Sequence, residues 1–409
     1  MGRSRLAGIA LVIAFAMTAC SRGTDSIVVG AMYPTHGGQG PGGLEEYRGV
    51  ELAAQLANVR GGVDGRRVRL ELVPADSADA VPQAMDTLMR RGARVVLGSY
   101  GSTMSAVAAR VAARRNVVFW ETGAVGLLPQ VRSGHVFRVP PTGETLGRVA
   151  VEFVRDVYLP RAKSTAAIRY GVAYVDDVYG RSVGTGAIDA IRRTGAAPAA
   201  FAYDARTANF TSLARRVRQA GVNVLVVGAY LDDGVALRRA LVRERVALVA
   251  NIGTSSSYCM PEFGRRLGAD AVGVFASDKP DGDAVPARVL RPDAAAALRW
   301  AQRTYRGRFG SEMPAPALAG FAGGWALFHD VLPSAHDTSV SGIVDAARRA
   351  NAPTGALPNG SGLAFGGNRA GASENLRAAS VIWEWVAPTR RAIVWPPGFA
   401  SRDIAVGLR

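Results

Sequence analysis

Residues 94–120 read RVVLGSYGSTMSAVAARVAARRNVVFW, and this stretch indicates the fold class of the whole chain. It contains an apolar run at 94–98, a helical stretch at 102–114 and a second apolar run at 117–120. Apolar runs without strict alternation, separated by about 10 to 15 residues of helix, are typical of parallel strands in a sheet covered on both faces. Such strand–helix–strand units wind right-handed, so we expect a doubly wound α/β fold.

The same alternation extends in both directions from this stretch. Before it we expect strands at 26–32 and 67–73, with helices at 44–58 and 80–91. After a strand at 136–139 and the pair Pro140-Pro141 the rhythm starts again, which indicates two similarly built lobes. The second series predicts strands at 167–175, 199–203, 222–228, 246–251 and 271–276, helices at 144–158, 180–193, 210–220 and 232–244, then helices at 294–306, 315–332 and 340–349 and a final strand at 379–386.

The first 19 residues have the pattern of a secretory signal peptide. Arg3 and Arg5 precede an apolar run at 6–17, and Met17-Thr18-Ala19-Cys20 closes it. The run is shorter than the roughly 20 apolar residues that a spanning helix needs. The four closing residues resemble the bacterial lipobox, whose cysteine is lipidated, so we expect Cys20 to carry the membrane anchor and 20–25 to be a tether. An ordinary signal peptide with a chance cysteine is the alternative.

The charge of the chain is strongly basic, with a formal net charge of +16 at pH 7. Nearly all of it is arginine, and doublets such as Arg90-Arg91 and Arg114-Arg115 fall late in expected helices. Cations at helix C-termini suit the helix dipole and face solvent, so the charge does not require a nucleic-acid partner, and export argues against one. Attraction to anionic lipid or cell wall stays open, and it would weaken with salt.

Signatures of catalysis and of metal binding are scarce. The four histidines have no metal-ligand spacing, and no nucleophile elbow occurs. Residues 38–43 satisfy G-x-G-x-x-G, but the spacer before Gly38 and the late acid Asp76 do not fit a dinucleotide fold, so a flexible loop is expected there. Cys259 has no partner for a disulfide and is interpreted as a small buried residue rather than a nucleophile. We expect no enzyme, no cofactor and no metal.

Polar residues follow several of the expected strands. In open parallel sheets, ligands bind beyond the carboxyl ends of the strands. Ser102 and Thr103 open a helix there, and their hydroxyls with the free N–H groups of the first turn can hold a carboxylate; for Ser102 a simple helix cap is the alternative. Tyr179 and Tyr230 offer a flat apolar face with a hydroxyl, unless they serve interdomain packing. The candidate ligand-binding residues are Tyr100, Ser102, Thr103, Glu121, Gly123, Ala124, Asp177, Tyr179, Tyr230 and Ser256.

Several pieces of sequence, taken in order and spacing, carry a resemblance to a known family. They are IVVG at 27–30, GVELA at 49–53, RGGVDGR at 60–66, Gly98 with Ser102, the segment 175–180 ending in Tyr179-Gly180, NFT at 209–211 and the strand at 224–228. With them the chain resembles the type I periplasmic substrate-binding proteins of the branched-chain amino acid, amide and urea group, which serve ABC transporters. The resemblance covers almost the whole chain after the signal peptide.

The resemblance implies two α/β lobes joined by three crossings, with the ligand in the cleft between them and hinge closure on binding. We place lobe I at 26–139 and 277–358, and lobe II at 140–276 and 359–409. Family members hold an amino acid's carboxylate with two hydroxyls, of which Ser102 matches the first. The second falls near Val125, which has none. The family's acid for the amine falls in the loop 254–257, where Ser256 stands without a carboxylate, so Glu121, Asp177 or Asp232 would have to replace it.

The sequence therefore predicts an extracytoplasmic solute-binding lipoprotein. It would capture a small polar solute, an amino acid or an amide-like molecule, close around it and deliver it to ABC permease subunits. We expect a monomer that is anchored to the membrane by the lipid on Cys20. The alternatives are a sensor of the same fold that acts on a receptor, and an exported enzyme on this fold.

Overall fold

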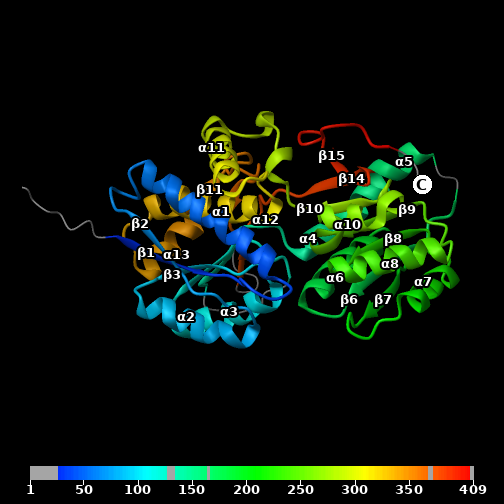
Figure 1. Cartoon of the computed structure of the whole chain (residues 1–409), viewed down its shortest axis with the longest axis horizontal. Helices are drawn as coiled ribbons and strands as arrows, with labels where there is room; N and C mark the ends of the chain where they lie inside the picture. Colours follow the sequence, from blue (N-terminus) through cyan, green and yellow to red (C-terminus); the bar gives the residue numbers. More distant parts are fainter. Residues whose placement is uncertain (1–25, 127–133, 164–165, 367–371, 406–409) are drawn as a thin grey trace, which may run out of the picture.

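The computed structural model describes residues 26–126, 134–163, 166–366 and 372–405, which form two lobes side by side (Figure 1). The expected signal peptide and the lipidation site Cys20 lie outside the described residues. No helix in the described part of the chain is long and apolar enough to cross a membrane. We call the half that contains β1 lobe I and the half that contains β6 lobe II.

Lobe I is built on a parallel sheet, as its two-sided apolar strands predicted. The strand order is β13 (Ala372–Glu374), β5 (Val136–Arg138), β4 (Val118–Glu121), β3 (Val95–Gly98), β1 (Ile27–Met32) and β2 (Val68–Leu72). Because all six strands run the same way, their carboxyl ends lie at one edge and their starts at the opposite edge.

Helices cover both faces of this sheet. α2 (Val81–Arg90) and α3 (Ser102–Arg115) pack on one face, after a short 3-10 turn at Ala78–Ala80. The other face is covered by α1 (Gly40–Val59), α11 (Pro292–Phe309), α12 (Ala315–Trp325) and α13 (Val340–Arg349). Helices α1 and α12 can cross in close contact because Gly49 has no Cβ. A Cβ at this position would overlap the carbonyl oxygen of Ala317.

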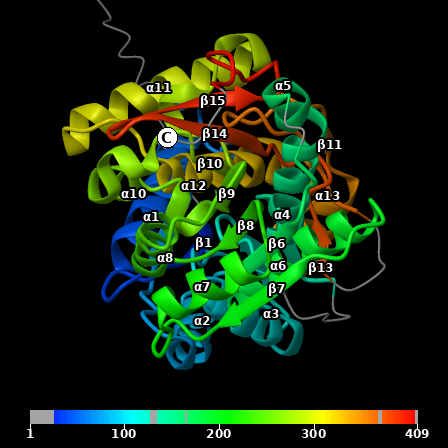
Figure 2. The same cartoon turned by 90° about the vertical axis from the view of Figure 1, so that its right-hand side faces the viewer.

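Lobe II repeats the plan with one difference at its edge (Figure 2). Its strand order is β15 (Arg390–Trp395), β14 (Val381–Ala387), β10 (Phe275–Asp278), β9 (Ala250–Thr254), β8 (Val224–Gly228), β6 (Tyr170–Val175) and β7 (Ala199–Tyr203). From β10 to β7 the strands are parallel, whereas β14 pairs antiparallel with both β10 and β15. Two doubly wound sheets are therefore confirmed, and an antiparallel hairpin closes one edge of the second.

The helices of lobe II likewise lie on both faces of its sheet. α4 (Gly143–Phe153) and α6 (Val178–Arg192) cover one face. α7 (Phe210–Gln219), α8 (Leu231–Arg243) and α10 (Pro261–Leu267) cover the other. The short helices α5 (Leu159–Ala162) and α9 (Ser255–Tyr258) complete the lobe, with 3-10 turns at Gly268–Ala271, Gly282–Ala284 and Ala287–Val289 after it.

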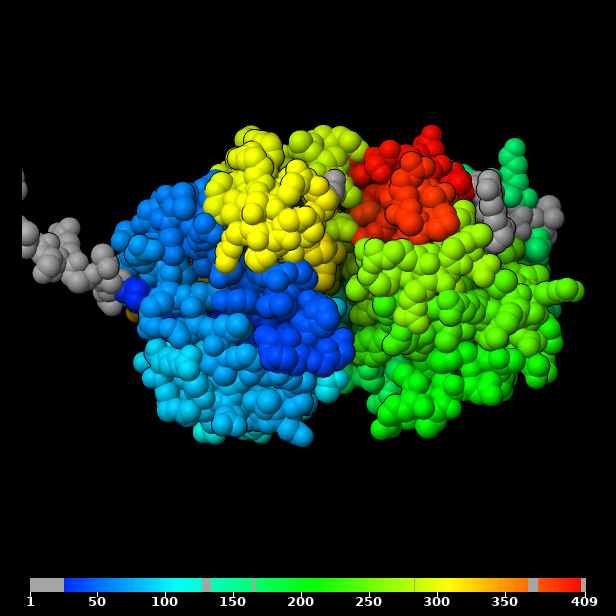
Figure 3. Space-filling model, viewed as in Figure 1, coloured from blue at the N-terminus to red at the C-terminus, as the bar shows by residue number. Residues whose placement is uncertain are grey.

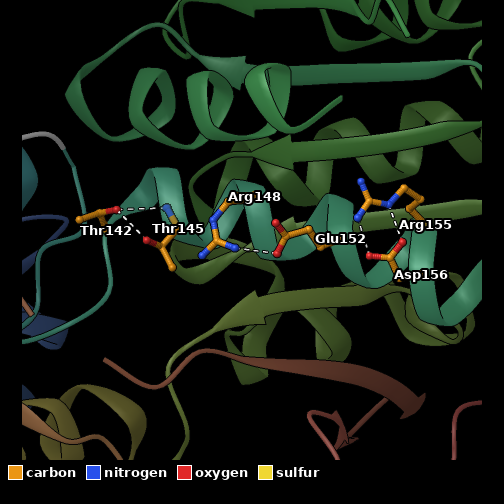
Figure 4. A network of polar contacts seen from close by, with 6 residues as sticks. All are labelled: Thr142, Thr145, Arg148, Glu152, Arg155 and Asp156. Atoms are coloured by element: carbon orange, nitrogen blue, oxygen red, sulfur yellow. Dashed lines mark hydrogen bonds and ion pairs between the residues drawn. The ribbon is translucent and has the colours of Figure 1, made fainter. Parts of the chain in front are cut away.

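α4 is the first helix after the chain enters lobe II. Hydrogen bonds and ion pairs between polar side chains follow one another along it (Figure 4). The Thr142 hydroxyl caps it by accepting from the Thr145 N–H at 3.1 Å. One turn later Arg148 pairs with Glu152 at 2.6 Å, the favourable i,i+4 spacing. The helix then widens into a π-helical turn at Val154–Tyr158, so the expected helix at 144–158 is confirmed with a changed pitch at its end.

Two sequence expectations for lobe II are corrected. The strand expected at 246–251 is β9 at Ala250–Thr254, because α8 is followed by an irregular connection that shares its apolar character. The final strand is confirmed as β14, but its partner β15 was not foreseen. Trp383 and Trp385 of β14 are 3% and 1% exposed and so belong to the core of lobe II.

The chain crosses between the lobes three times. The first crossing follows β5, the second follows β10, and the third runs from β13 to β14. Asn375 in the third crossing donates from its side chain to the Val139 carbonyl of the first at 3.0 Å. The Trp383 indole donates to the Lys279 carbonyl of the second at 3.4 Å. The sequence placed the third crossing between residues 358 and 359. Since β13 lies in the sheet of lobe I, we propose that the third crossing begins after Glu374.

Candidate ligand-binding site

The carboxyl ends of the two sheets face each other across the junction of the lobes. The Lys279 ammonium donates to the Gly123 carbonyl at 3.0 Å, and the Gly143 N–H donates to the Val125 carbonyl at 2.6 Å. A Cβ on Gly126 would lie 3.1 Å from the Val178 side chain of lobe II. The space-filling view shows a furrow between the two halves at this junction (Figure 3). The loops predicted to bind a ligand therefore lie on opposing walls.

On the wall of lobe I, Ser102 joins two of these loops. It is 7% exposed, and its hydroxyl oxygen accepts from the Gly126 N–H at 3.0 Å. The helix cap is Gly101, so Ser102 is the first helical residue of α3 rather than its cap. The first intrahelical bond runs from the Ser105 N–H to the Gly101 carbonyl at 2.9 Å. The backbone N–H groups of the residues before Ser105 have no acceptor within the helix and lie at its end next to the junction. The Thr103 side chain there is exposed.

The Glu121 carboxylate is turned into lobe I and binds its own loop rather than the junction between the lobes. It is fully buried, and one carboxylate oxygen accepts from the N–H groups of Gly123 and Ala124 at 2.8 and 2.7 Å. The other oxygen accepts from the Ser105 hydroxyl. Burial raises the pKa of this carboxyl, and the nearby Arg138 guanidinium opposes that rise. Glu121 thus shapes the loop that carries the candidate residues Gly123 and Ala124.

A second buried acid, Glu46 on α1, supports the same loop and was missed from the sequence. It is 1% exposed, and its Oε1 accepts from the Thr122 hydroxyl at 2.6 Å. The Tyr33 hydroxyl lies 2.6 Å from the same Thr122 oxygen. Burial, and then the charge of Glu121, raise the pKa of Glu46 to about 8. Its place three residues before Gly49 and four before Val50, on the buried face of the helix, was the available signal.

On the wall of lobe II, the four candidate residues come together. The Tyr179 hydroxyl lies 2.8 Å from the Thr254 hydroxyl, and the Ser256 N–H donates to Tyr179 at 3.4 Å. The Tyr230 hydroxyl donates to one oxygen of Asp177 at 2.7 Å, and the other oxygen of Asp177 accepts from the N–H of Gly180. The two tyrosine rings lie 5.2 Å apart. The tyrosines therefore contact each other within their own lobe.

The acid that best fits the junction is one that sequence reasoning did not name. Asp278 ends β10, is 4% exposed, and its Oδ1 has no hydrogen-bond partner among the described residues. Its charge acts on Tyr100 of lobe I and on Tyr179 of lobe II, and its carboxyl also interacts with the thiol of Cys259. Burial, with smaller contributions from Glu46 and Asp278, raises the pKa of the Tyr100 hydroxyl to about 12. The signal was an acid two residues after an expected strand.

The remaining acid considered from the sequence is excluded. The Asp232 side chain is 91% exposed and pairs with Arg266 of α10 at 2.6 Å. Cys259 is buried, as expected, and burial holds the pKa of its thiol well above the usual range. Among the described residues, no group of three or more acidic, histidine or cysteine side chains could hold a metal ion.

The comparison with known families decides what kind of protein has this architecture. A family model described as periplasmic binding protein matches residues 26–382. The chain belongs to that family. The periplasmic binding protein is similar to the Leu/Ile/Val-binding protein homolog 8 of Brucella suis, with 26% identity over 386 residues, 93% of each chain. The resemblance stated from the sequence is confirmed. This family and this relative are binding proteins, so the chain is a binding protein and not an enzyme, as the sequence predicted.

Solved structures share the fold of the binding protein at low identity. The branched-chain amino acid binding protein of Streptococcus pneumoniae, in complex with isoleucine, has a TM-score of 0.68 at 16% identity, covering 91% of this chain and all of that one. A solute-binding protein from R. palustris, in complex with benzoate, has a TM-score of 0.69 at 14% identity, with 93% and 99% coverage. The two-lobed α/β fold is therefore confirmed.

Proposed function

We propose that this binding protein captures a small amino acid or amide-like solute between its lobes for an ABC transporter. The lipid on Cys20 anchors it, and the lobes close on the solute as a monomer before the permease subunits receive it. The amino-terminal turn of α3 with Ser102 and Thr103 would bind the carboxylate of the solute. Tyr100, Gly123 and Ala124 line the same wall, and Tyr179, Tyr230 and Ser256 the opposite one.

The observation that carries this proposal is the unpartnered oxygen of Asp278. A buried carboxylate oxygen without a hydrogen-bond donor is costly, and a bound ammonium or amide N–H would satisfy it. Asp278 lies on lobe II and the α3 terminus on lobe I, so one solute with an acid group at one end and a donor at the other would join the lobes. The names of the relatives support an amino acid, since the Brucella protein is called a Leu/Ile/Val-binding protein homolog.

Benzoate in the R. palustris structure provides the contrast for a test. A carboxylate without an amine would use the α3 terminus but leave Asp278 unsatisfied. Binding of leucine, isoleucine, valine, their amides and benzoate is measured by thermal shift and confirmed by calorimetry. A ligand at 100 times its dissociation constant stabilises the protein by about 2.7 kcal/mol, which is easily detected.

Variants assign the site. Asp278→Asn should weaken binding of an amino acid by about 30-fold or more, because removing one partner of a buried charge pair costs about 2 kcal/mol or more. Asp232→Asn on the surface of the same lobe is the matched control and should bind like the wild type. Ser102→Ala should weaken the binding of every solute that carries a carboxylate. If Asp278→Asn binds amino acids as well as the control does, Asp278 is not the amine site; silence across the whole panel refutes the proposed solute class.

A further inference from the structure

The end of lobe I that points away from the binding site gathers its arginines. In a parallel sheet with helical connections, the starts of the strands and the ends of the preceding helices meet at one edge. Here that edge is opposite the carboxyl ends that face lobe II (Figure 1). We call it the distal face. Its exposed arginines are Arg60 after α1, Arg67 before β2, Arg90 at the end of α2 and Arg91 after it, Arg94 before β3, Arg114 and Arg115 at the end of α3, and Arg348 and Arg349 at the end of α13.

Six of these nine arginines have no acidic partner among the described residues. Three are paired: Arg60 with Asp293 at 3.1 Å, Arg91 with Glu71 at 3.2 Å and Arg115 with Asp86 at 3.3 Å. Arg67, Arg90, Arg94, Arg114, Arg348 and Arg349 make no ion pair with any described residue. Asp64 and Asp345 are exposed acids at the same face. The distal face therefore keeps an excess of positive charge that its own acids do not neutralise.

The distal face is also grooved. One groove of about 620 Å³ runs beside α1 and β2 and is lined by Val59, Arg67 and Leu70 among others. Val59 is 67% exposed, which is unusual for a large apolar side chain of this protein. A second groove of about 580 Å³ lies between Arg94 and Arg348. Each groove is also lined by one acid, Glu51 in the first, where it pairs with Arg308, and Asp345 in the second. The arginines without an acidic partner among the described residues, Arg67 in the first groove and Arg94 and Arg348 in the second, fit phosphate head groups, and Val59 beside the first groove fits acyl chains.

The tether enters the fold at this same face. The described chain starts immediately before β1, and the Ile27 N–H donates to the Arg67 carbonyl at 2.8 Å. The six residues 20–25 can span at most about 20 Å when fully extended. A chain anchored at Cys20 therefore holds Arg67 near the bilayer surface, where the attraction of an anionic leaflet acts within a Debye length of about 8 Å.

We propose that the distal face of lobe I docks on anionic phospholipid head groups of the membrane that anchors the chain. The inference rests on the anchor at Cys20 in the proposed function. Lobe II also has exposed arginines without acidic partners among the described residues, such as Arg193, Arg243 and Arg390, but no tether starts there. The position of the tether, not charge alone, selects lobe I.

The test couples the body from Cys20 onward, which contains every described element, to maleimide lipid in vesicles through the Cys20 thiol. Cys259 does not compete, because it is buried and its thiol pKa is raised. An arginine-selective dicarbonyl reagent with mass-spectrometric readout measures the reactivity of each guanidinium. On phosphatidylglycerol vesicles Arg67, Arg94 and Arg348 should react several-fold more slowly than on phosphatidylcholine vesicles, and high salt should remove the difference. Equal rates on the two lipids at low salt would overturn the proposal.

Charge-matched variants give the second arm of the test. The triple variant R67Q/R94Q/R348Q should lose the difference between lipids when coupled. Without coupling, it should sediment with phosphatidylglycerol vesicles about tenfold or more weaker than the wild type. The control R193Q/R243Q/R390Q removes the same charge from lobe II and should keep both. Equal losses in the two triples would mean unspecific attraction, and protection that depends on protein concentration without vesicles would mean a second copy on this face; either result overturns the proposal.

The coupling is chemical, so this test does not depend on lipidation in the cell. The mass of the amino-terminal peptide of the protein extracted from membranes tests the anchor by itself. The solute-binding measurements test the proposed capture of a solute separately, because the distal face and the ligand site lie at opposite edges of the sheet of lobe I.

Discussion

Replacing Glu46 with glutamine should stabilise the protein at alkaline pH and change its stability little in acid. The pKa of this buried carboxyl is about 8 in the folded protein and 4.5 in the unfolded chain. Between those values the native state holds a proton that the unfolded chain releases. The stability associated with the protonated group is therefore present below about pH 4.5 and is lost as the pH rises towards 8, by about 1.4 kcal/mol for each pH unit.

From about pH 5 to pH 7 this single group should lower the free energy of unfolding by roughly 2 to 3 kcal/mol. Glutamine has the same shape, can accept the bond from the Thr122 hydroxyl and does not titrate. Urea unfolding of wild type and Glu46→Gln, followed by tryptophan fluorescence across this range, gives the difference as a function of pH. Glu262→Gln removes an exposed carboxylate as the control. A difference between wild type and Glu46→Gln that stays constant with pH would refute the buried, protonated state of Glu46.

Two further predictions concern lobe I. The His329 ring lies between the carboxylates of Asp293 and Asp330, each at 2.9 Å, and the hydrogen bond to Asp330 contributes most to raising its pKa. This stabilisation is complete below the unfolded pKa of 6.5 and is lost as the pH rises through the folded value, so His329→Gln should lower the melting temperature more near pH 5.5 than near pH 8. Gly49→Ala should cost about 1 to 3 kcal/mol or more in chemical unfolding, because its methyl group forces α1 and α12 apart. Gly307→Ala, at a helical site with open space, should instead stabilise by about 0.5 to 1 kcal/mol, and similar destabilisation of both would contradict the close crossing.

The sequence was sufficient for the parallel core because burial on both faces leaves a visible mark. Strands such as β3 and β8 are apolar at nearly every position, and each is followed by a helix of ordinary length. The β14–β15 hairpin was only half predicted. β15 begins with Arg390-Arg391 and lies at the edge of the sheet, so its apolar run is limited to the four residues 392–395.

The loops that carry the candidate site could be predicted from the sequence, but the contacts of their side chains could not. The loops after the strands could be placed, since topology brings the carboxyl ends of parallel strands together. Which side chains turn into the junction could not, because that depends on packing between segments far apart in sequence. Glu121 bends back onto its own loop, and Glu46 reaches that loop from α1. Asp278 was overlooked because the end of its strand was placed two residues too early.

The three crossings are not independent hinges. In lobe I the first and third leave from neighbouring strands, where Arg138 lies opposite Glu374. In lobe II the second and third join neighbouring strands, where Asp278 lies opposite Val381. The third crossing is therefore held to both others by paired strands, so we expect the three crossings to move together when the lobes rotate. Leu376 in that segment is 73% exposed, so a single cut there by a protease would release that coupling without removing any part of the ligand site.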